Sequence, residues 1–150
     1  MASRILYILN GPNLNLLGER EPQIYGTTTL AQIEDRCRAR AAERGLESDF
    51  RQTNFEGVLI EAVQEARTKA AGIIINPSGL SFTSIALLDA LKMFDGPKIE
   101  LHISNIHKRE EIYQRSLVSR TATAVIAGLG ASGYEVAIDA MRVLIDEGRS

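Results

Sequence analysis

Apolar residues along the chain alternate between short continuous runs and longer segments in which they recur every three or four positions. Continuous runs of aliphatic and β-branched residues are typical of strands buried on both faces of a sheet. Recurrence every three or four positions is typical of helices with one apolar face. The pattern predicts five strands, over residues 4–9, 46–53, 73–75, 98–103 and 122–127.

Helical spacing together with polar residues suited to helix capping predicts the intervening helices. The first helix begins after three threonines at residues 27–29 and ends at Gly45. The second takes Asn54 as its N-cap. The last begins with a capping box formed by Ser132 and Glu135.

A further helix, over residues 81–94, is apolar on nearly all sides. One face of a sheet cannot bury such a helix completely, so we expect part of it to contact another subunit. Its apolar residues are Ile85, Ala86, Leu87, Leu88, Ala90, Leu91 and Met93.

Strict alternation of strands and helices indicates an α/β protein with a doubly wound, five-stranded parallel sheet and helices on both faces. The second strand is more polar than the others, which suits a sheet edge and favours the flavodoxin-like strand order 2-1-3-4-5. A chain of 150 residues can bury a core of its own. We therefore expect a single catalytic domain over residues 1–150.

The composition argues against several classes of binding partner. A net charge of −2 gives no reason to expect nucleic acid or an anionic membrane as partner. No apolar run is long enough to span a membrane, and we expect a cytoplasmic protein. The lone cysteine, Cys37, excludes a disulfide framework and a cysteine-based metal site, and its place on an apolar stripe predicts a core residue.

An irregular segment follows the first strand and runs for about sixteen residues, which is long for a connection inside a compact domain. Three leucines, at positions 14, 16 and 17, argue against disorder, and the segment also carries Arg20 and Tyr25. We interpret it as a functional loop, with residues 18–26 acting as a lid.

Residues 128–133 match the GxGxxG pattern of dinucleotide-binding proteins and follow a predicted strand. That fingerprint normally follows the first strand and needs an acidic residue at the end of a further strand. Because neither condition holds here, we favour close packing of strand and helix as the reason for these glycines.

Ligands of open α/β sheets bind beyond the carboxyl ends of the strands, at the point where the strand order reverses. That rule brings together the residues that follow strands one, three and four. The set contains neither a Ser–His–Asp arrangement nor metal-ligand spacing, so it suits proton transfer next to a carbonyl group. Its members are Asn10, Asn13, Arg20, Tyr25, Asn76, Ser78, His102, Ile103, Ser104, Asn105 and Arg109.

Side-chain chemistry suggests how the protons move within this set. A free tyrosine has a pKa of about 10 and is a poor base near neutrality, but a nearby arginine favours the phenolate. Tyr25 with Arg20 or Arg109 is therefore a candidate base, and His102 is the better candidate acid. Glu100 lies two positions earlier on the same strand face and could orient the imidazole. Taken alone, a tyrosine in such a turn is more often a packing residue than a base, and His102 could equally be a structural histidine.

Several segments spread over nearly the whole chain resemble the type II 3-dehydroquinate dehydratases. The resemblance implies loss of water from 3-dehydroquinate to give 3-dehydroshikimate through an enolate, in the shikimate pathway of aromatic amino acid biosynthesis. It also implies a homododecamer built from trimers and no metal or organic cofactor. The segments are residues 10–18, 20–22, 25–26, 75–79, 83–89, 100–105, 107–111 and 128–134.

The resemblance assigns catalytic roles to residues that match the family motifs. It implies that Tyr25 removes the proton alpha to the ketone, that Asn76 positions a water against the enolate, and that His102 protonates the departing hydroxyl. The remaining residues support these three. The full catalytic set is Tyr25, His102, Arg20, Asn76, Arg109 and Glu100.

The same resemblance implies the contacts that hold the substrate. The backbone amides of Ile103 and Ser104 would bind its carboxylate, and Asp89 would reach the site of a neighbouring subunit. Asn13, which follows the first strand, joins Asn76 as a candidate substrate contact because of its place in the predicted sheet.

Two positions depart from the family pattern. Phe82 stands where the family usually has histidine, and Tyr113 stands where it usually has arginine, with Arg115 two positions further on. In the resembled enzymes both positions contact ring hydroxyls of the substrate, so Arg115 could take over that contact. A dehydratase of a related cyclic β-hydroxy ketone acid and a catalytically silent flavodoxin-like binding protein are the alternative functions.

Overall fold

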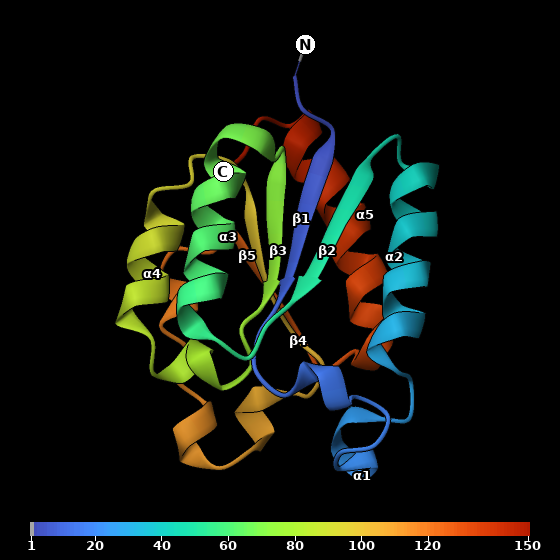
Figure 1. Cartoon of the computed structure of the whole chain (residues 1–150), viewed down its shortest axis with the longest axis vertical. Helices are drawn as coiled ribbons and strands as arrows, with labels where there is room; N and C mark the ends of the chain where they lie inside the picture. The colour runs from blue at the N-terminus through green and yellow to red at the C-terminus, as the bar shows by residue number, and fades with distance from the viewer. Residues whose placement is uncertain (1) are drawn as a thin grey trace.

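The computed structural model describes residues 2–150 and contains a five-stranded, all-parallel sheet between two layers of helices (Figure 1). The strand order is β2-β1-β3-β4-β5, which confirms the predicted flavodoxin-like arrangement. The strands are β1 (Ile5–Asn10), β2 (Glu47–Gln52), β3 (Gly72–Asn76), β4 (Lys98–His102) and β5 (Ala124–Ala127).

Helices α2 and α5 pack on one face of the sheet, and α3 and α4 pack on the other (Figure 1). Six short 3-10 turns, η1 to η6, lie between these elements. The helices are α1 (Pro22–Tyr25), α2 (Leu30–Glu43), α3 (Glu56–Lys69), α4 (Ile85–Lys92) and α5 (Gly133–Asp146). The turns are η1 (Leu14–Leu16), η2 (Ser78–Phe82), η3 (Ile106–Lys108), η4 (Glu111–Tyr113), η5 (Val118–Arg120) and η6 (Gly130–Ser132).

The continuous apolar runs arise because β1, β3 and β4 are buried on both faces. In β1, Leu6 and Ile8 contact the core under α2 and α5, and Tyr7 and Leu9 contact the core under α3 and α4. Cys37 lies fully buried in the first of these cores, where burial raises the pKa of its thiol to about 12. It is a packing residue, as its place on the apolar stripe predicts.

The predicted single helix over residues 81–94 is wrong. Its first part is the turn η2, and α4 begins only after Ser84, whose hydroxyl accepts a hydrogen bond from the backbone amide of Leu87 at 2.9 Å. The N-cap therefore sets the start of the helix later than the apolar spacing suggests. Ile85 and Met93 remain 64% and 48% exposed, so the sheet does not cover the whole helix.

One of the predicted caps is confirmed and another is wrong. Thr29 forms a capping box with Gln32 at the start of α2. Asn54 does not cap α3, because its side-chain oxygen accepts a hydrogen bond from the backbone amide of Asn13 at 2.9 Å. That contact attaches the irregular segment after β1 to the loop after β2.

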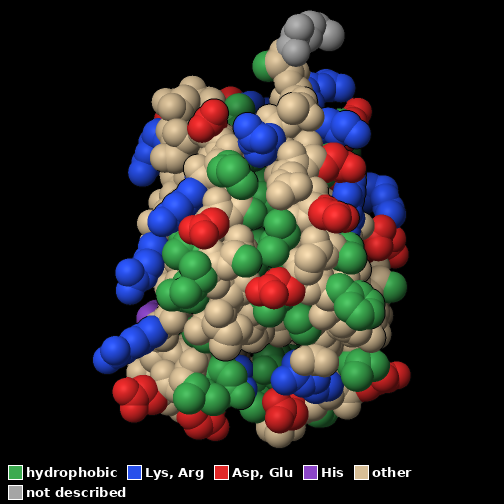
Figure 2. Space-filling view, turned by 60° about the vertical axis from the view of Figure 1, so that its left-hand side comes forward, with side chains coloured by type: hydrophobic (Ala, Val, Ile, Leu, Met, Phe, Trp, Pro, Cys, Tyr) green, Lys and Arg blue, Asp and Glu red, His purple; other side chains and the backbone are tan. Residues whose placement is uncertain are grey.

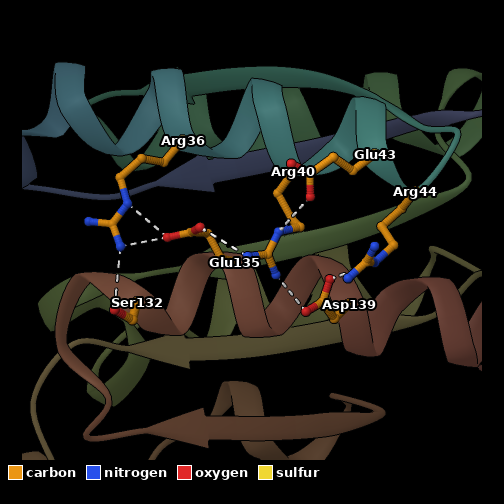
Figure 3. Close-up of polar contacts among 7 residues, drawn as sticks. All are labelled: Arg36, Arg40, Glu43, Arg44, Ser132, Glu135 and Asp139. Carbon is orange, nitrogen blue, oxygen red and sulfur yellow. Dashed lines mark hydrogen bonds and ion pairs between the residues drawn. The ribbon is translucent and has the colours of Figure 1, made fainter.

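The capping box predicted for Ser132 and Glu135 is also absent, because both side chains serve a contact between α2 and α5 (Figure 3). Arg36 donates to Glu135 at 2.7 Å, and Arg40 donates to Asp139 at 2.7 Å. Arg40 also reaches Glu135, so a ladder of ion pairs joins the two helices.

Arg40 is the central rung of this ladder, and we expect Arg40→Met to lower the free energy of unfolding by about 1 kcal/mol. The matched control is Arg38→Met, because Arg38 is 63% exposed and pairs only within α2, with Glu34 and Asp35. Urea denaturation of both variants measures the difference, which should shrink in high salt. Equal effects for the two arginines would contradict a structural role for the ladder.

Candidate active site

A cavity opens at the carboxyl ends of β1, β3 and β4, where the sequence predicts the ligand site. Its polar lining comes from loops that are far apart in the sequence. The residues around it are Asn13, Leu14, Arg20, Tyr25, Asn76, Ser78, Gly79, Phe82, His102, Ile103, Ser104, Ile106, Arg109 and Tyr113.

Five of the predicted site residues lie outside this lining. Asn10 is buried and accepts a hydrogen bond from Tyr134, and Asn105 caps the turn η3. Glu100 is buried beneath His102 and contacts it directly. Arg115 lines a neighbouring shallow depression that shares Phe82 with the cavity. Asp89 is exposed on α4, away from the cavity of its own chain.

Close approach of two loops shapes the floor of the cavity. A Cβ atom on Gly11 would lie 2.4 Å from the carbonyl oxygen of Pro77, so only glycine fits where the segments after β1 and β3 meet. Beyond this point the chain turns sharply, with Asn13 in the left-handed conformation at φ 71°. Leu14 and Leu17 are buried and anchor the segment that leads to α1.

Tyr25 ends the short helix α1 and lies between two arginines. The Arg109 guanidinium donates a hydrogen bond to the Tyr25 hydroxyl at 2.9 Å. The Arg20 guanidinium carbon lies 4.9 Å from the centre of the Tyr25 ring. Two guanidinium groups therefore flank the phenol on the wall of the cavity.

His102 ends β4, and its Nε2 atom lies 2.5 Å from a carboxylate oxygen of Glu100. Glu100 is fully buried, which by itself would raise the pKa of its carboxyl group. Hydrogen bonds from His102, Ser119 and Ser116 outweigh burial and hold that pKa below its ordinary value. The ionised carboxylate orients the imidazole and compensates the positive charge that a histidine acid carries.

Tyr134 is a buried residue of the site region that the sequence analysis assigned only to the apolar face of α5. Its hydroxyl donates to Asn10 at 2.7 Å and accepts a hydrogen bond from the Asn76 amide at 3.0 Å. Burial raises the pKa of Tyr134 above its ordinary value, so the hydroxyl keeps its proton. Asn76 is thereby fixed, with its amide oxygen accepting from the Ser78 backbone at 3.2 Å. The clue in the sequence is that a buried tyrosine needs a polar partner.

The arrangement places a tyrosine and a histidine on one cavity, each in contact with a side chain of a charged residue. It suits removal of a proton next to a carbonyl group and protonation of a leaving group. Across residues 2–150 the structure contains no group of three or more His, Cys, Asp or Glu side chains placed to hold a metal ion. No helix in the same range is long and apolar enough to cross a membrane.

Comparison with known proteins gives one consistent result. The sequence profile described as "Dehydroquinase class II" matches residues 4–142. The chain is 55% identical to a 3-dehydroquinate dehydratase of Cereibacter sphaeroides over 89% of its length and 90% of the relative. It is 51% identical to the 3-dehydroquinate dehydratase of Streptomyces avermitilis over 100% of its own length and 95% of that relative. The crystal structure of a type II dehydroquinase from Propionibacterium acnes matches with a TM-score of 0.91 and 43% identity, over 94% and 97% of the two chains.

Proposed function

This chain belongs to the class II dehydroquinase family and dehydrates 3-dehydroquinate, and we propose that Tyr25 and His102 divide this reaction between them. Tyr25 acts as the base and His102 as the acid. The observation that carries the proposal is the pairing of each side chain with its own charged partner on the wall of a single cavity.

In the first step, the ionised Tyr25 oxygen takes the proton from the carbon alpha to the ketone, and the bonding electrons move onto the ketone oxygen as an enolate. Arg109 and Arg20 keep positive charge beside the tyrosine oxygen and ring. We propose that Asn76, fixed by Tyr134 and Ser78, holds a water molecule against the enolate oxygen.

In the second step, the enolate collapses, the carbon–oxygen bond to the hydroxyl breaks, and His102 supplies the proton that turns the hydroxyl into water. The buried Glu100 carboxylate supports the charged imidazole before this transfer. His102 and Tyr25 then return to their starting forms by exchanging protons with solvent. The atoms balance as one enone and one water.

The substrate carboxylate needs donors at the end of β4. We propose that it binds the backbone amides of Ile103 and Ser104, which line the cavity next to His102. Asn13 lines the cavity from the loop after β1 and would contact the ring of the substrate.

We also propose that the whole chain is one catalytic domain, with residues 18–26 as its lid. We propose further that it acts in the cytoplasm, which suits its free buried thiol.

An oligomer is the second part of the proposal. Ile85 on α4 and Met93 just after it have exposed apolar side chains. Phe55 and Val58 at the start of α3 are also exposed, and α3 packs on the same face of the sheet as α4. Figure 2 turns this side forward and shows hydrophobic side chains gathered among charged ones. We propose that copies of the chain cover this surface, in line with the dodecamer of trimers that the resemblance implies, and that Asp89 on α4 approaches a neighbour's cavity.

Replacing Tyr25 by phenylalanine tests the base. Because the phenol oxygen takes part in proton transfer and the ring remains to contact the substrate, kcat should fall by about 10²- to 10⁴-fold with little change in substrate binding. Enone absorbance gives the rate. Tyr7→Phe is the matched control, because Tyr7 donates to Glu65, outside the cavity lining. A Tyr25→Phe enzyme with most of its kcat would remove Tyr25 from this role.

Sedimentation velocity tests the oligomer. At micromolar protein concentration we expect a species much heavier than the 16.4 kDa chain. Ile85→Lys should shift the distribution toward smaller species, because a charge cannot be buried in an apolar contact without a partner. A monomeric unmodified protein would contradict the proposed covering of α4.

A further inference from the structure

A continuous line of packed side chains connects the proposed base to the proposed acid along one wall of the cavity. The Arg109 guanidinium carbon lies 5.6 Å from the centre of the Tyr25 ring and 4.2 Å from the centre of the Tyr113 ring. The Tyr113 and Phe82 ring centres are 5.7 Å apart, and those of Phe82 and His102 are 5.9 Å apart. The two halves of the site therefore share one set of packing contacts.

The contact between Tyr113 and Arg109 is made by the face of the ring. A guanidinium over an aromatic face is attracted by the ring's negative charge density, and this attraction does not need the tyrosine hydroxyl. Gln114, the next residue, donates to the backbone carbonyl of Arg109 at 2.6 Å. Neighbouring residues of the same loop thus hold both the backbone and the side chain of Arg109.

Phe82 occupies the centre of the line. Its ring meets that of Tyr113 nearly edge-on, at 75°, and lies close to parallel with the His102 imidazole, at 28°. Edge-to-face and offset-stacked geometries are the favourable ones for aromatic pairs. Phe82 can therefore fix the plane of the imidazole, while Glu100 fixes its hydrogen-bonding direction.

We propose that Tyr113 and Phe82 are positioning residues, whose ring faces hold Arg109 against Tyr25 and hold His102 in its plane. This inference rests on the proposed roles of Tyr25 and His102. It assigns the two residues a different task from hydrogen bonding to substrate hydroxyls. A long arginine side chain has several rotamers, and the ring selects the one in which the guanidinium reaches the tyrosine oxygen.

Three variants of Tyr113 and Phe82 test the proposal, with kcat, KM and the pH profile of kcat/KM as readouts. Tyr113→Phe keeps the ring face, so kcat and KM should stay within about twofold. Tyr113→Leu removes the face and should lower kcat by roughly three- to thirtyfold, the range for loss of a cation–π contact. The pH profile of kcat/KM should also change, because the Arg109 guanidinium would no longer be held at the Tyr25 hydroxyl.

Phe82→Leu provides a second measurement that does not depend on the fold of the η4 turn. Its effect and that of Tyr113→Leu should combine less than additively, since both act through one line of contacts. Ile112→Ala is the matched control, because Ile112 lies on the same turn as Tyr113 but is 71% exposed. Its kinetics should equal those of the unmodified enzyme.

Unchanged kcat and an unchanged pH profile in Tyr113→Leu would overturn the proposal. So would a Tyr113→Phe enzyme whose KM rises as much as that of Tyr113→Leu, because the hydroxyl would then be binding the substrate. Failure of the proposed function looks different. In that case Tyr25→Phe would stay active, whereas failure of the positioning role alone leaves Tyr25→Phe inactive and Tyr113→Leu active.

Discussion

The buried charge of Glu100 is the constraint on which the catalytic end of the molecule depends. A carboxylate with no solvent contact in a sheet interior is costly unless it is hydrogen-bonded from several sides. Here the donors come from His102 and from hydroxyls of Ser81, Ser116 and Ser119. Stabilising this charge therefore draws the loops after β3 and β4 together, and it fixes the histidine as part of the same arrangement.

The half of the site that carries the proposed base is built differently. Tyr25 lies on a short helix in an irregular segment. Its hydroxyl accepts a hydrogen bond from Arg109, which comes from the loop after β4. Beneath the cavity, Tyr134 joins the ends of β1 and β3 through Asn10 and Asn76. The proposed acid and the floor are thus held by buried hydrogen bonds, whereas the proposed base lies in the irregular segment that we propose as a lid. Packing contacts run from Arg109 through the rings of Tyr113 and Phe82 to His102 and connect the two halves of the site.

The sequence was sufficient for the sheet, because strands buried on both faces leave continuous apolar runs and the polar second strand identifies an edge. It also located the cavity, since parallel strands bring the residues that follow them to one end. It failed where a polar side chain has a distant partner. Asn54 and Ser132 look like caps, yet they bind Asn13 and Arg36, which lie 41 and 96 residues away. The hydrogen bonds of Tyr134 and the contact between Tyr113 and Arg109 were missed because spacing along the chain says nothing about such partners.

The central claim is that Tyr25 acts as the base and His102 as the acid. Exchange of the alpha proton of 3-dehydroquinate in heavy water tests this claim most directly. Proton removal precedes loss of the hydroxyl, so a His102→Ala enzyme should form the enolate and return it. Recovered substrate should then carry deuterium alpha to the ketone, as seen by NMR, while little product forms. A Tyr25→Phe enzyme should give no deuterium beyond the rate in buffer. Exchange by Tyr25→Phe as fast as by His102→Ala would contradict the assignment of base and acid.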